Sequence, residues 1–194
     1  MLTPRPKKEH ENGFTIIELM VFIIVGVILF TAVGELFVTT LRSGKRGTLQ
    51  TDLERNAVLG VETLKNTIQP AKTVVASRAF GAGNFTSDRD TLVLELPSVD
   101  TSGNLLAGVS DYIAFFRDLN DFSLLKITTE AATGSIRISN TRLVSSFVDS
   151  LEFRYNKGNI VDADAIDINL VTKTTFASET LRASASARIE LRNK

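Results

Sequence analysis

Apolar and polar residues follow three different patterns along the chain, and the first is a long apolar run near the N-terminus. From Phe14 to Gly34, Glu18 is the only ionisable side chain. A run of about 20 apolar residues is long enough to cross the hydrocarbon core of a bilayer as a helix. The pattern therefore predicts a membrane-spanning helix over residues 14–34.

The second pattern is a helical repeat that follows this run. Apolar residues recur there at steps of three and four, which places them on one face of a helix. Pro70 ends this helix, and Gly44 and Gly47 could loosen it. We therefore expect an amphipathic stem helix over residues 35–70, laid against a sheet. The expected buried face comprises Leu49, Leu53, Ala57, Val61, Leu64 and Ile68.

The third pattern is typical of strands and fills residues 71–194, which we expect to form a β-rich globular domain. Short segments rich in β-favouring residues are separated there by Gly, Asn or Asp. Residues 156–159 indicate a turn, and residues 77–90, with few large apolar side chains, indicate a surface loop. The expected strands cover residues 91–96, 112–116, 124–128, 135–139, 151–155 and 165–171. The Phe residues expected in the core are Phe115, Phe116, Phe147 and Phe153.

The clearest alternation lies at the end of the chain. Apolar residues from Leu181 to Leu191 alternate with polar ones, which predicts one buried face and one solvent-facing face. The three central apolar residues are Ala183, Ala185 and Ala187, so the stem helix could approach this strand closely. Together the patterns predict an α+β fold in which a long N-terminal α-helix packs on antiparallel β-sheets.

The composition limits the chemistry that the chain could perform. It contains no Cys, and its one His is His10, which precedes the apolar run. Disulfides, thiolate metal sites and Cys nucleophiles are therefore excluded, and the predicted domain has no His for acid–base catalysis. The 22 basic and 22 acidic residues cancel, so no basic field favours a nucleic-acid partner. We expect a non-enzymatic protein without a cofactor.

Glu18 carries the strongest functional implication. An ionised carboxylate inside a membrane helix is energetically costly, so such residues are usually paired and functional. The expected partner is a cation. The simpler alternatives are an ordinary signal anchor or a cleaved secretory signal. A secretory signal, however, has an apolar core of about 7 to 15 residues, and the apolar run here is longer.

The segment Gly-Phe-Thr-Ile-Ile-Glu-Leu-Met that begins at Gly13, with Lys7 and Lys8 before it, closely resembles the N-terminus of the type IV pilin superfamily. This superfamily comprises the type IV pilins and the pseudopilins of type II secretion and competence systems. The resemblance implies a leader over residues 1–13, which the prepilin peptidase removes by cutting after Gly13. It also implies that Phe14 becomes the first residue of the mature chain and is N-methylated.

The same resemblance assigns an assembly role to Glu18. In pilins, the carboxylate at this position neutralises the α-ammonium of the first residue, here Phe14, on a neighbouring subunit as the helices stack in a filament. The implied partners are other minor and major pilins or pseudopilins, the prepilin peptidase, the inner-membrane assembly platform and membrane lipid. The implied location is the cytoplasmic (inner) membrane, crossed once, with the C-terminal domain outside the cytoplasm.

Segments further along the chain narrow the resemblance. The segments are the stem around Arg55, residues 112–115, the Leu-rich residues 123–128, residues 148–155 and residues 189–193. In their order they resemble J-type minor pseudopilins and the related W-type minor pilins, which implies a subunit of the initiating complex at the filament tip. The subunit at the very tip of type II complexes typically lacks the fifth-position acid, so Glu18 implies a place beneath another subunit.

Two alternative functions stay open. A major pilin would form the body of the fibre, but many major pilins carry a Pro in the second half of the hydrophobic helix, and this chain has none there. A membrane-anchored extracytoplasmic ligand-binding domain is the second alternative. The sequence does not distinguish a type II secretion system from a type IV pilus or a DNA-uptake system.

Asp162, Asp164 and Asp167 are the nearest match to the C-terminal calcium site of major type II pseudopilins. Oxygen ligands on nearby residues bind calcium only if a loop brings them together. Asp164 and Asp167 flank the start of a predicted strand, which favours a solvated strand edge over a metal site. We therefore expect no metal and keep these three residues as the one calcium candidate.

Arg42, Lys45 and Arg46 follow the apolar run as a basic cluster. Basic residues normally mark the cytoplasmic flank of a membrane helix, but the residues before this helix are equally basic, so the charges leave its orientation undecided. The expected orientation comes from the pilin resemblance. We interpret the cluster as a solvated basic collar that could contact lipid headgroups or acidic residues of an adjacent subunit.

Overall fold

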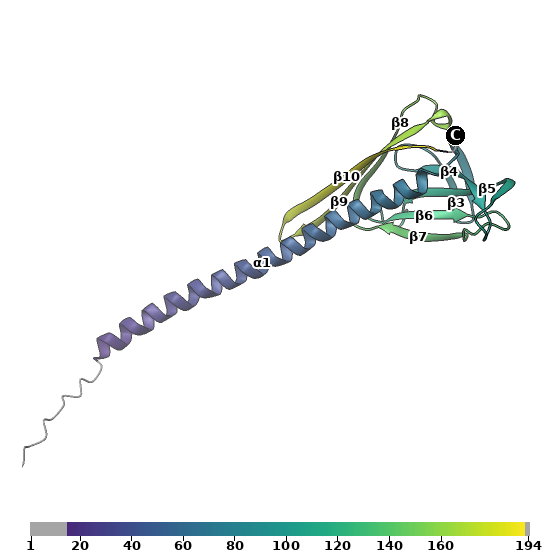
Figure 1. The fold of residues 1–194 in the computed structure, drawn as a ribbon. Helices are drawn as coiled ribbons and strands as arrows, with labels where there is room; N and C mark the ends of the chain where they lie inside the picture. The colour runs from purple at the N-terminus through teal and green to yellow at the C-terminus, as the bar shows by residue number, and fades with distance from the viewer. Residues whose placement is uncertain (1–14, 193–194) are drawn as a thin grey trace, which may run out of the picture. The chain divides into compact units, whose positions relative to one another are not determined.

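The computed structural model describes residues 15–192 (Figure 1). This part of the chain forms one long helix, α1 (Ile16–Ile68), followed by ten strands and a short 3₁₀ helix, η1 (Ile160–Asp162). It separates into two compact units with their boundary between Lys45 and Arg46. The predicted α+β class, with a long N-terminal helix packed on antiparallel sheets, is confirmed.

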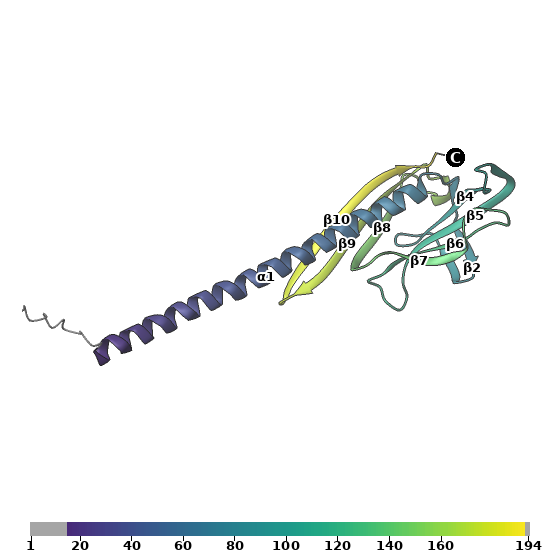
Figure 2. The same cartoon turned by 60° about the horizontal axis from the view of Figure 1, so that its bottom comes forward.

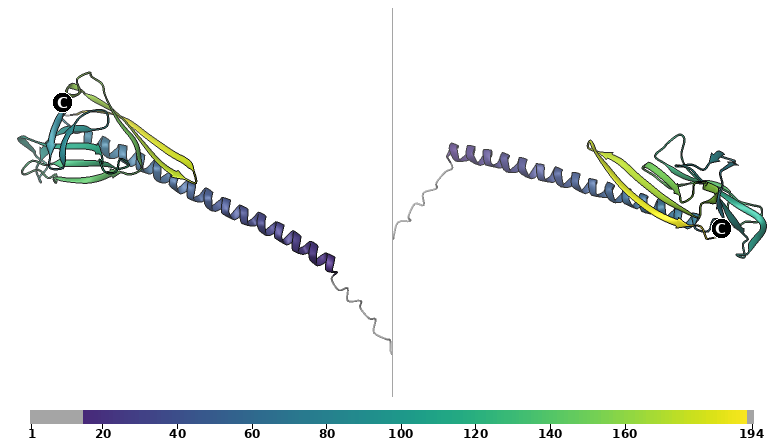
Figure 3. Two further views of the ribbon diagram at one scale, coloured as in Figure 1. Left: turned by 180° about the vertical axis from the view of Figure 1, so that it is seen from behind. Right: turned by 90° about the horizontal axis from the view of Figure 1, so that it is seen from above.

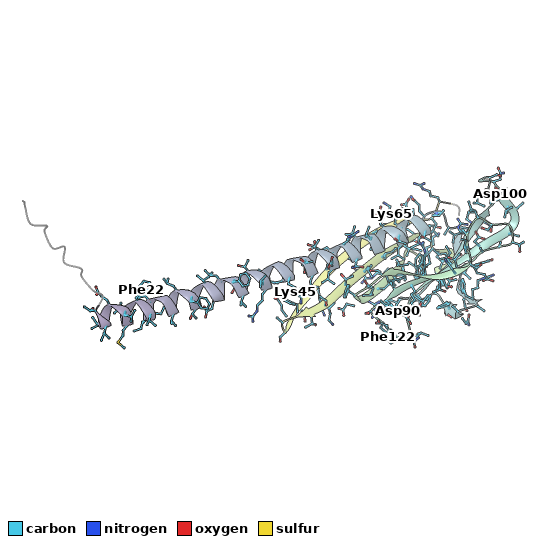
Figure 4. The ribbon with its side chains drawn as sticks, turned by 90° about the horizontal axis from the view of Figure 1, so that it is seen from below. Phe22, Lys45, Lys65, Asp90, Asp100 and Phe122 are labelled. Carbon is cyan, nitrogen blue, oxygen red and sulfur yellow. The ribbon has the colours of Figure 1, made fainter. Side chains whose placement is uncertain are left out.

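The N-terminal unit contains the first part of α1. Its large apolar side chains are exposed from Ile16 to Leu41, and Phe22 points outward from the helix (Figure 4). By its length and composition, this helix could span a membrane. The described part of the expected membrane segment is therefore helical. The expected leader, residues 1–13, and Phe14 lie outside the described residues.

The second part of α1, which we call the stem, begins at Arg46 and has the predicted amphipathic character. Its buried residues recur at steps of three and four, while Leu49 is half-buried. The expected loosening at Gly44 and Gly47 is absent, because α1 is continuous through both. A Gly costs a helix interior only about 1 kcal/mol relative to Ala, which a helix of this length tolerates. The buried stem residues are Leu53, Ala57, Gly60, Val61, Leu64 and Ile68.

A five-stranded antiparallel sheet provides one side of the core. Its order is β1-β4-β5-β6-β7, so β7 forms one edge. The strands are β1 (Thr73–Val74), β4 (Leu92–Val99), β5 (Leu105–Arg117), β6 (Leu125–Glu130) and β7 (Asn140–Ser145). Leu94 pairs with Ile113, and Phe115 pairs with Ile127. These buried side chains join Leu64 of the stem in the main hydrophobic cluster.

A three-stranded antiparallel sheet provides the other side. It comprises β8 (Val148–Tyr155), β9 (Ala165–Phe176) and β10 (Glu179–Glu190), in the order β10-β9-β8. The stem lies alongside β9 and β10 in every view (Figures 1, 2 and 3). The hydroxyl of Thr172 donates to the carbonyl of Leu53 at 3.0 Å, and Gln50 Nε2 donates to the carbonyl of Arg182 at 3.2 Å.

The predicted alternation in the last strand is confirmed. Leu181 and Ile189 are buried, while Ala185 and Ala187 are partly buried and pack against the main cluster that contains the stem. The intervening polar residues are exposed, Ser184 among them. The small side chains of the central residues therefore lie on the face of β10 that packs toward the core.

Residues 77–90 contain a hairpin, so the expected surface loop is a wrong prediction. The hairpin consists of β2 (Ser77–Phe80) and β3 (Gly83–Thr86). Phe80 and Phe85 meet edge to face at 5.6 Å between ring centroids. Together with Val93 and Ala114 they form a second cluster on the other face of the five-stranded sheet. Two aromatic side chains thus give this polar segment enough buried area to order it.

Two other predictions are also wrong. Residues 135–139 form no strand; they belong to the connection between β6 and β7, and the strand begins only at Asn140. Phe147 is 41% exposed and has a φ of 61°, in the left-handed region, where it forms the sharp turn from β7 into β8. Phe115 and Phe153 are buried as expected, and Phe116 is half-buried.

The other expected strands are confirmed as β4, β5, β6, β8, β9 and β10. Most bounds differ by at most three residues, but β5 begins seven residues earlier than expected and β9 ends five residues later. The turn expected at residues 156–159 lies in the connection between β8 and η1. These strands were recognisable because local β-favouring residues and their alternation agree with the burial that the fold imposes.

Candidate functional site

Glu18 lies in the first turn of α1, where it forms a capping box with Thr15. The backbone N–H and the hydroxyl of Thr15 each donate to Glu18 Oε2 at 3.0 Å. In return, the Glu18 N–H donates to Thr15 Oγ1 at 3.3 Å. Such reciprocal bonds satisfy donors that the start of a helix otherwise leaves unpaired. They fix where α1 begins and hold the Glu18 carboxylate against the first turn.

Thr15 was not identified as a functional residue from the sequence. The signal was present, because Thr15 and Glu18 have the Thr-x-x-Glu spacing of a capping box immediately before an apolar run. The capping box engages one carboxylate oxygen of Glu18. Within residues 15–192, no group donates a hydrogen bond to the other oxygen, Oε1.

The surroundings of Glu18 are apolar. Val21, Phe22 and Val25 follow it at helical spacing and are all exposed. No Lys or Arg in the described part of the chain forms an ion pair with Glu18. The first basic residue after it is Arg42, about 36 Å further along the helix at 1.5 Å per residue. A cationic partner for Glu18 therefore has to come from the chain's own N-terminus or from another molecule.

Gly13 and Phe14, the two residues expected at the processing site, lie outside the described residues. Phe14 directly precedes Thr15, the N-cap of α1. Cleavage after Gly13 would therefore place the new α-amine one residue before the capping box. The sequence-predicted assembly residues Phe14 and Glu18 are thus separated only by Thr15 and the first residues of the helix.

The three residues of the basic collar do not all belong to the same unit. Arg42 and Lys45 belong to the N-terminal unit and are exposed. Arg46 belongs to the second unit, where its Nη2 lies 2.5 Å from Oε1 of Glu179 at the start of β10. One charge of the expected collar is therefore paired within the chain, in an exposed contact between the stem and β10.

The three calcium candidates do not form one site. Asp162 Oδ2 accepts a hydrogen bond from Asn159 Nδ2 at 2.8 Å, and Asp164 pairs with Lys157. Asp167 lies on β9 and faces Arg188 at 3.7 Å. Across residues 15–192, no group of three or more acidic, His or Cys side chains is placed to hold a metal ion.

A buried charge network surrounds Asp111. Asp111 is wholly buried on β5, and its Oδ2 lies 2.5 Å from Nη1 of Arg137. It also accepts hydrogen bonds from the hydroxyls of Ser98 and Ser135 and from the N–H of Ala132. Burial by itself would raise the pKa of Asp111, but these donors together hold that pKa below its ordinary value.

Sequence reasoning missed this network because its members are far apart along the chain, and no local spacing connects them. Its effect is to anchor the connection between β6 and β7 to β5. The Arg137 Nη1 also donates to the carbonyl of Pro97 on β4 at 2.7 Å. Residues 131–139 are therefore fixed without forming a strand.

The chain matches no model of a known protein family, and its sequence matches no curated protein. Its function is therefore inferred from its residues and their geometry.

Proposed function

We propose that this chain is a minor pilin or pseudopilin, a non-enzymatic structural subunit of the initiating tip complex of a type II secretion pseudopilus or a type IV pilus. The observation that carries the proposal is Glu18. It is the one ionisable side chain in the exposed apolar run up to Gly34, at the start of a helix that could span a membrane, and within the described residues it has no cationic partner.

The physical argument starts from the exposed apolar side chains of α1. Their burial requires lipid or other helices, because no element of the N-terminal unit covers them among the described residues. In either setting, a Glu18 carboxylate without a partner is costly. The α-ammonium of Phe14 on a neighbouring helix satisfies it if the two helices are offset along their axes by about one to two turns.

The second unit supplies the remaining part of a subunit of this kind. In this unit the stem packs on two antiparallel sheets and forms a folded domain with its own hydrophobic core. In our proposal the domain lies outside the cytoplasm and contacts other pilin subunits. The prepilin peptidase acts at Gly13, and the membrane-embedded assembly platform extracts the helix.

The two alternatives make different demands on the molecule. A domain that performs general acid catalysis with a carboxyl group near neutral pH would raise the pKa of that group in a pocket. The buried Asp111 has a lowered pKa instead, and it is held by four donor groups of the chain itself. A major pilin differs in abundance, since it would dominate fibres sheared from cells.

Processing provides the direct experiment. We expect the mature protein to begin at methylated Phe14, which mass spectrometry of the N-terminal peptide can detect. Gly13→Leu places a bulky residue before the cut and should leave the leader attached, whereas Gly26→Leu, at a position with open space around it, should be processed normally. Equal ratios of full-length to mature protein for Gly13→Leu and wild type would contradict the proposal.

A further inference from the structure

The connection between β6 and β7 has its charged side chain inside and its isoleucines outside. Arg137 turns inward onto the wholly buried Asp111. Its two neighbours, Ile136 and Ile138, are 57% and 74% exposed. Isoleucine is normally among the most buried residue types and arginine among the most exposed. This connection therefore reverses the usual arrangement over three consecutive residues.

The reversed arrangement is rigidly held. Besides the contacts of Arg137, the N–H of Ile136 donates to the carbonyl of Val99 at 2.7 Å. The N–H of Ala131 donates to Ser139 Oγ at 2.9 Å. Both ends of the connection are thus fixed, and the two isoleucines are presented to the surroundings in one conformation. A surface that is fixed before binding loses little conformational entropy when a partner covers it.

The isoleucines form one wall of a groove on the inner face of the five-stranded sheet. The groove has a volume of about 430 Å³. Its lining also includes the buried side chains of Leu96, Ile113 and Ile127, and Asn66 and Thr67 at the end of the stem. The isoleucine surface that the groove exposes therefore comes from Ile136 and Ile138.

The charged side chains that line the groove are all basic. Its lining contains Arg137 and Arg142 and no acidic residue. Arg137 is neutralised by Asp111. Arg142 is exposed on β7, and across residues 15–192 no carboxylate forms an ion pair with it. The groove therefore combines two exposed isoleucines with one positive charge that no described residue compensates.

The groove adjoins a sheet edge. β7 is the last strand of its sheet, and Asn140 and Arg142 line the groove from it. An edge strand offers unpaired backbone groups to an added strand. In such additions the backbone bonds supply affinity and neighbouring side-chain pockets supply specificity. The shape of the site thus matches an extended segment better than a helix or a small molecule.

We infer that this groove and the β7 edge bind an extended segment of a different pilin subunit, one that carries an apolar side chain and a carboxylate. The apolar side chain packs against Ile136 and Ile138, and the carboxylate pairs with Arg142. The identity of the partner as a pilin subunit rests on the proposed function. A second copy of this chain fits less well, because its β7 strand carries Arg142 and no carboxylate to pair with the Arg142 of the first copy.

Site-directed crosslinking tests the inference in the full chain. The sequence has no Cys, so a single introduced Cys is the only thiol. Ile138→Cys and Leu119→Cys place that thiol at positions of similar exposure, 74% and 79%, with Leu119 outside the groove. After labelling with a photoactivatable thiol reagent in membranes that contain the complete set of subunits, we expect Ile138→Cys alone to form an adduct with a different pilin subunit.

The role of the Arg142 charge is tested in the same cells. Adding Arg142→Glu to Ile138→Cys should reduce the adduct at least tenfold, whereas Arg142→Lys should largely preserve it. Absence of an adduct from Ile138→Cys, equal adducts from both Cys positions, an adduct only with a second copy, or no effect of Arg142→Glu would each overturn the inference.

Failure of this inference can be separated from failure of the proposed function. If only the docking site is wrong, the unmodified chain still co-purifies with other pilin subunits, and Arg142→Glu leaves that recruitment unchanged. If the proposed function is wrong, no pilin subunit co-purifies with the unmodified chain, whatever residue occupies the groove.

Discussion

At the scale of single residues, Glu18 can serve two interactions at once. Its Oε2 accepts both bonds from Thr15 that begin α1, while Oε1 has no donor among the described residues. A neighbour's ammonium could therefore bind Oε1 without breaking the cap. The capping box also orients the carboxylate before assembly, so the helix start and the proposed contact depend on the same side chain.

Asp111 gives a residue-scale prediction about acid. Its folded-state pKa is lowered, and an unfolded Asp titrates near about 3.9. The stabilisation from its ionised form is therefore present above about pH 4 and is lost as the pH falls through the folded-state pKa. Asp111→Asn should lower the free energy of unfolding by on the order of 3 kcal/mol at neutral pH, and the difference from wild type should shrink below about pH 4.

Urea unfolding of the full chain in detergent, repeated across pH, measures this difference. Asp52→Asn, on the exposed side of the stem, is the matched control and should change the free energy of unfolding little at any pH. A wild-type advantage that stays constant down to pH 2, or an equal effect of Asp52→Asn, would show that the Asp111 network does not stabilise the fold as described.

Gly60 gives a second residue-scale prediction. A Cβ at this position would lie 2.6 Å from Cδ2 of the buried Leu170 and 3.2 Å from Cβ of Ser145. Gly60→Val should therefore overpack the contact between stem and sheet and cost about 1 to 3 kcal/mol. Gly47→Val, on the same helix with nothing within 4 Å, should leave stability unchanged or slightly raised. If thermal unfolding shows that Gly60→Val is as stable as wild type, the stem does not approach the sheet closely at Gly60.

At the scale of elements, local pattern and tertiary burial agree in most places and disagree in a few. The stem and β10 were predictable because their apolar residues repeat at 3.6 and 2 residues on the faces that the fold buries. The β2–β3 hairpin was not, because Phe80 and Phe85 reveal their role only once the sheet beneath them exists. Residues 135–139 alternate like a strand, but a distant carboxylate, Asp111, decides their conformation.

The packing of β10 gives an element-scale prediction. Ala185 is partly buried against the main cluster, whereas Ser184 is exposed on the other face of the strand. Ala185→Leu should cost about 1 to 3 kcal/mol by overpacking, and Ser184→Leu should change stability much less. The melting temperatures of the two full-length variants in detergent test this directly. Equal values would mean that the small face of β10 is not packed tightly.

At the scale of the whole molecule, the sequence predicted the α+β class and the residue that carries the proposed assembly role. Both depend on strong local signals: a long apolar run, two periodic segments and one acid in an unusual place. The groove beside β7 could not be predicted from the sequence, because Leu96, Ile127 and Ile136 come from separate segments that only the folded sheet brings together. Interaction surfaces of this kind have no local pattern to recognise.

The whole-molecule account depends on the charge of Glu18, and one substitution isolates it. Glu18→Gln preserves the capping box, since Gln also suits this position, and a neutral side chain enters a membrane more easily than a carboxylate. It removes only the attraction to a neighbour's ammonium. Glu35→Gln, an exposed position on the same helix beyond the apolar run, is the matched control.

The decisive measurement is crosslinking of each variant to other pilin subunits, together with fibre or secretion output, when the variant is the only copy in the cell. We predict normal membrane levels and normal processing for both variants, with recruitment and output lost for Glu18→Gln and retained for Glu35→Gln. If Glu18→Gln is recruited and functions as well as wild type, Glu18 is not the intersubunit ion-pair partner, and the proposed assembly role is wrong.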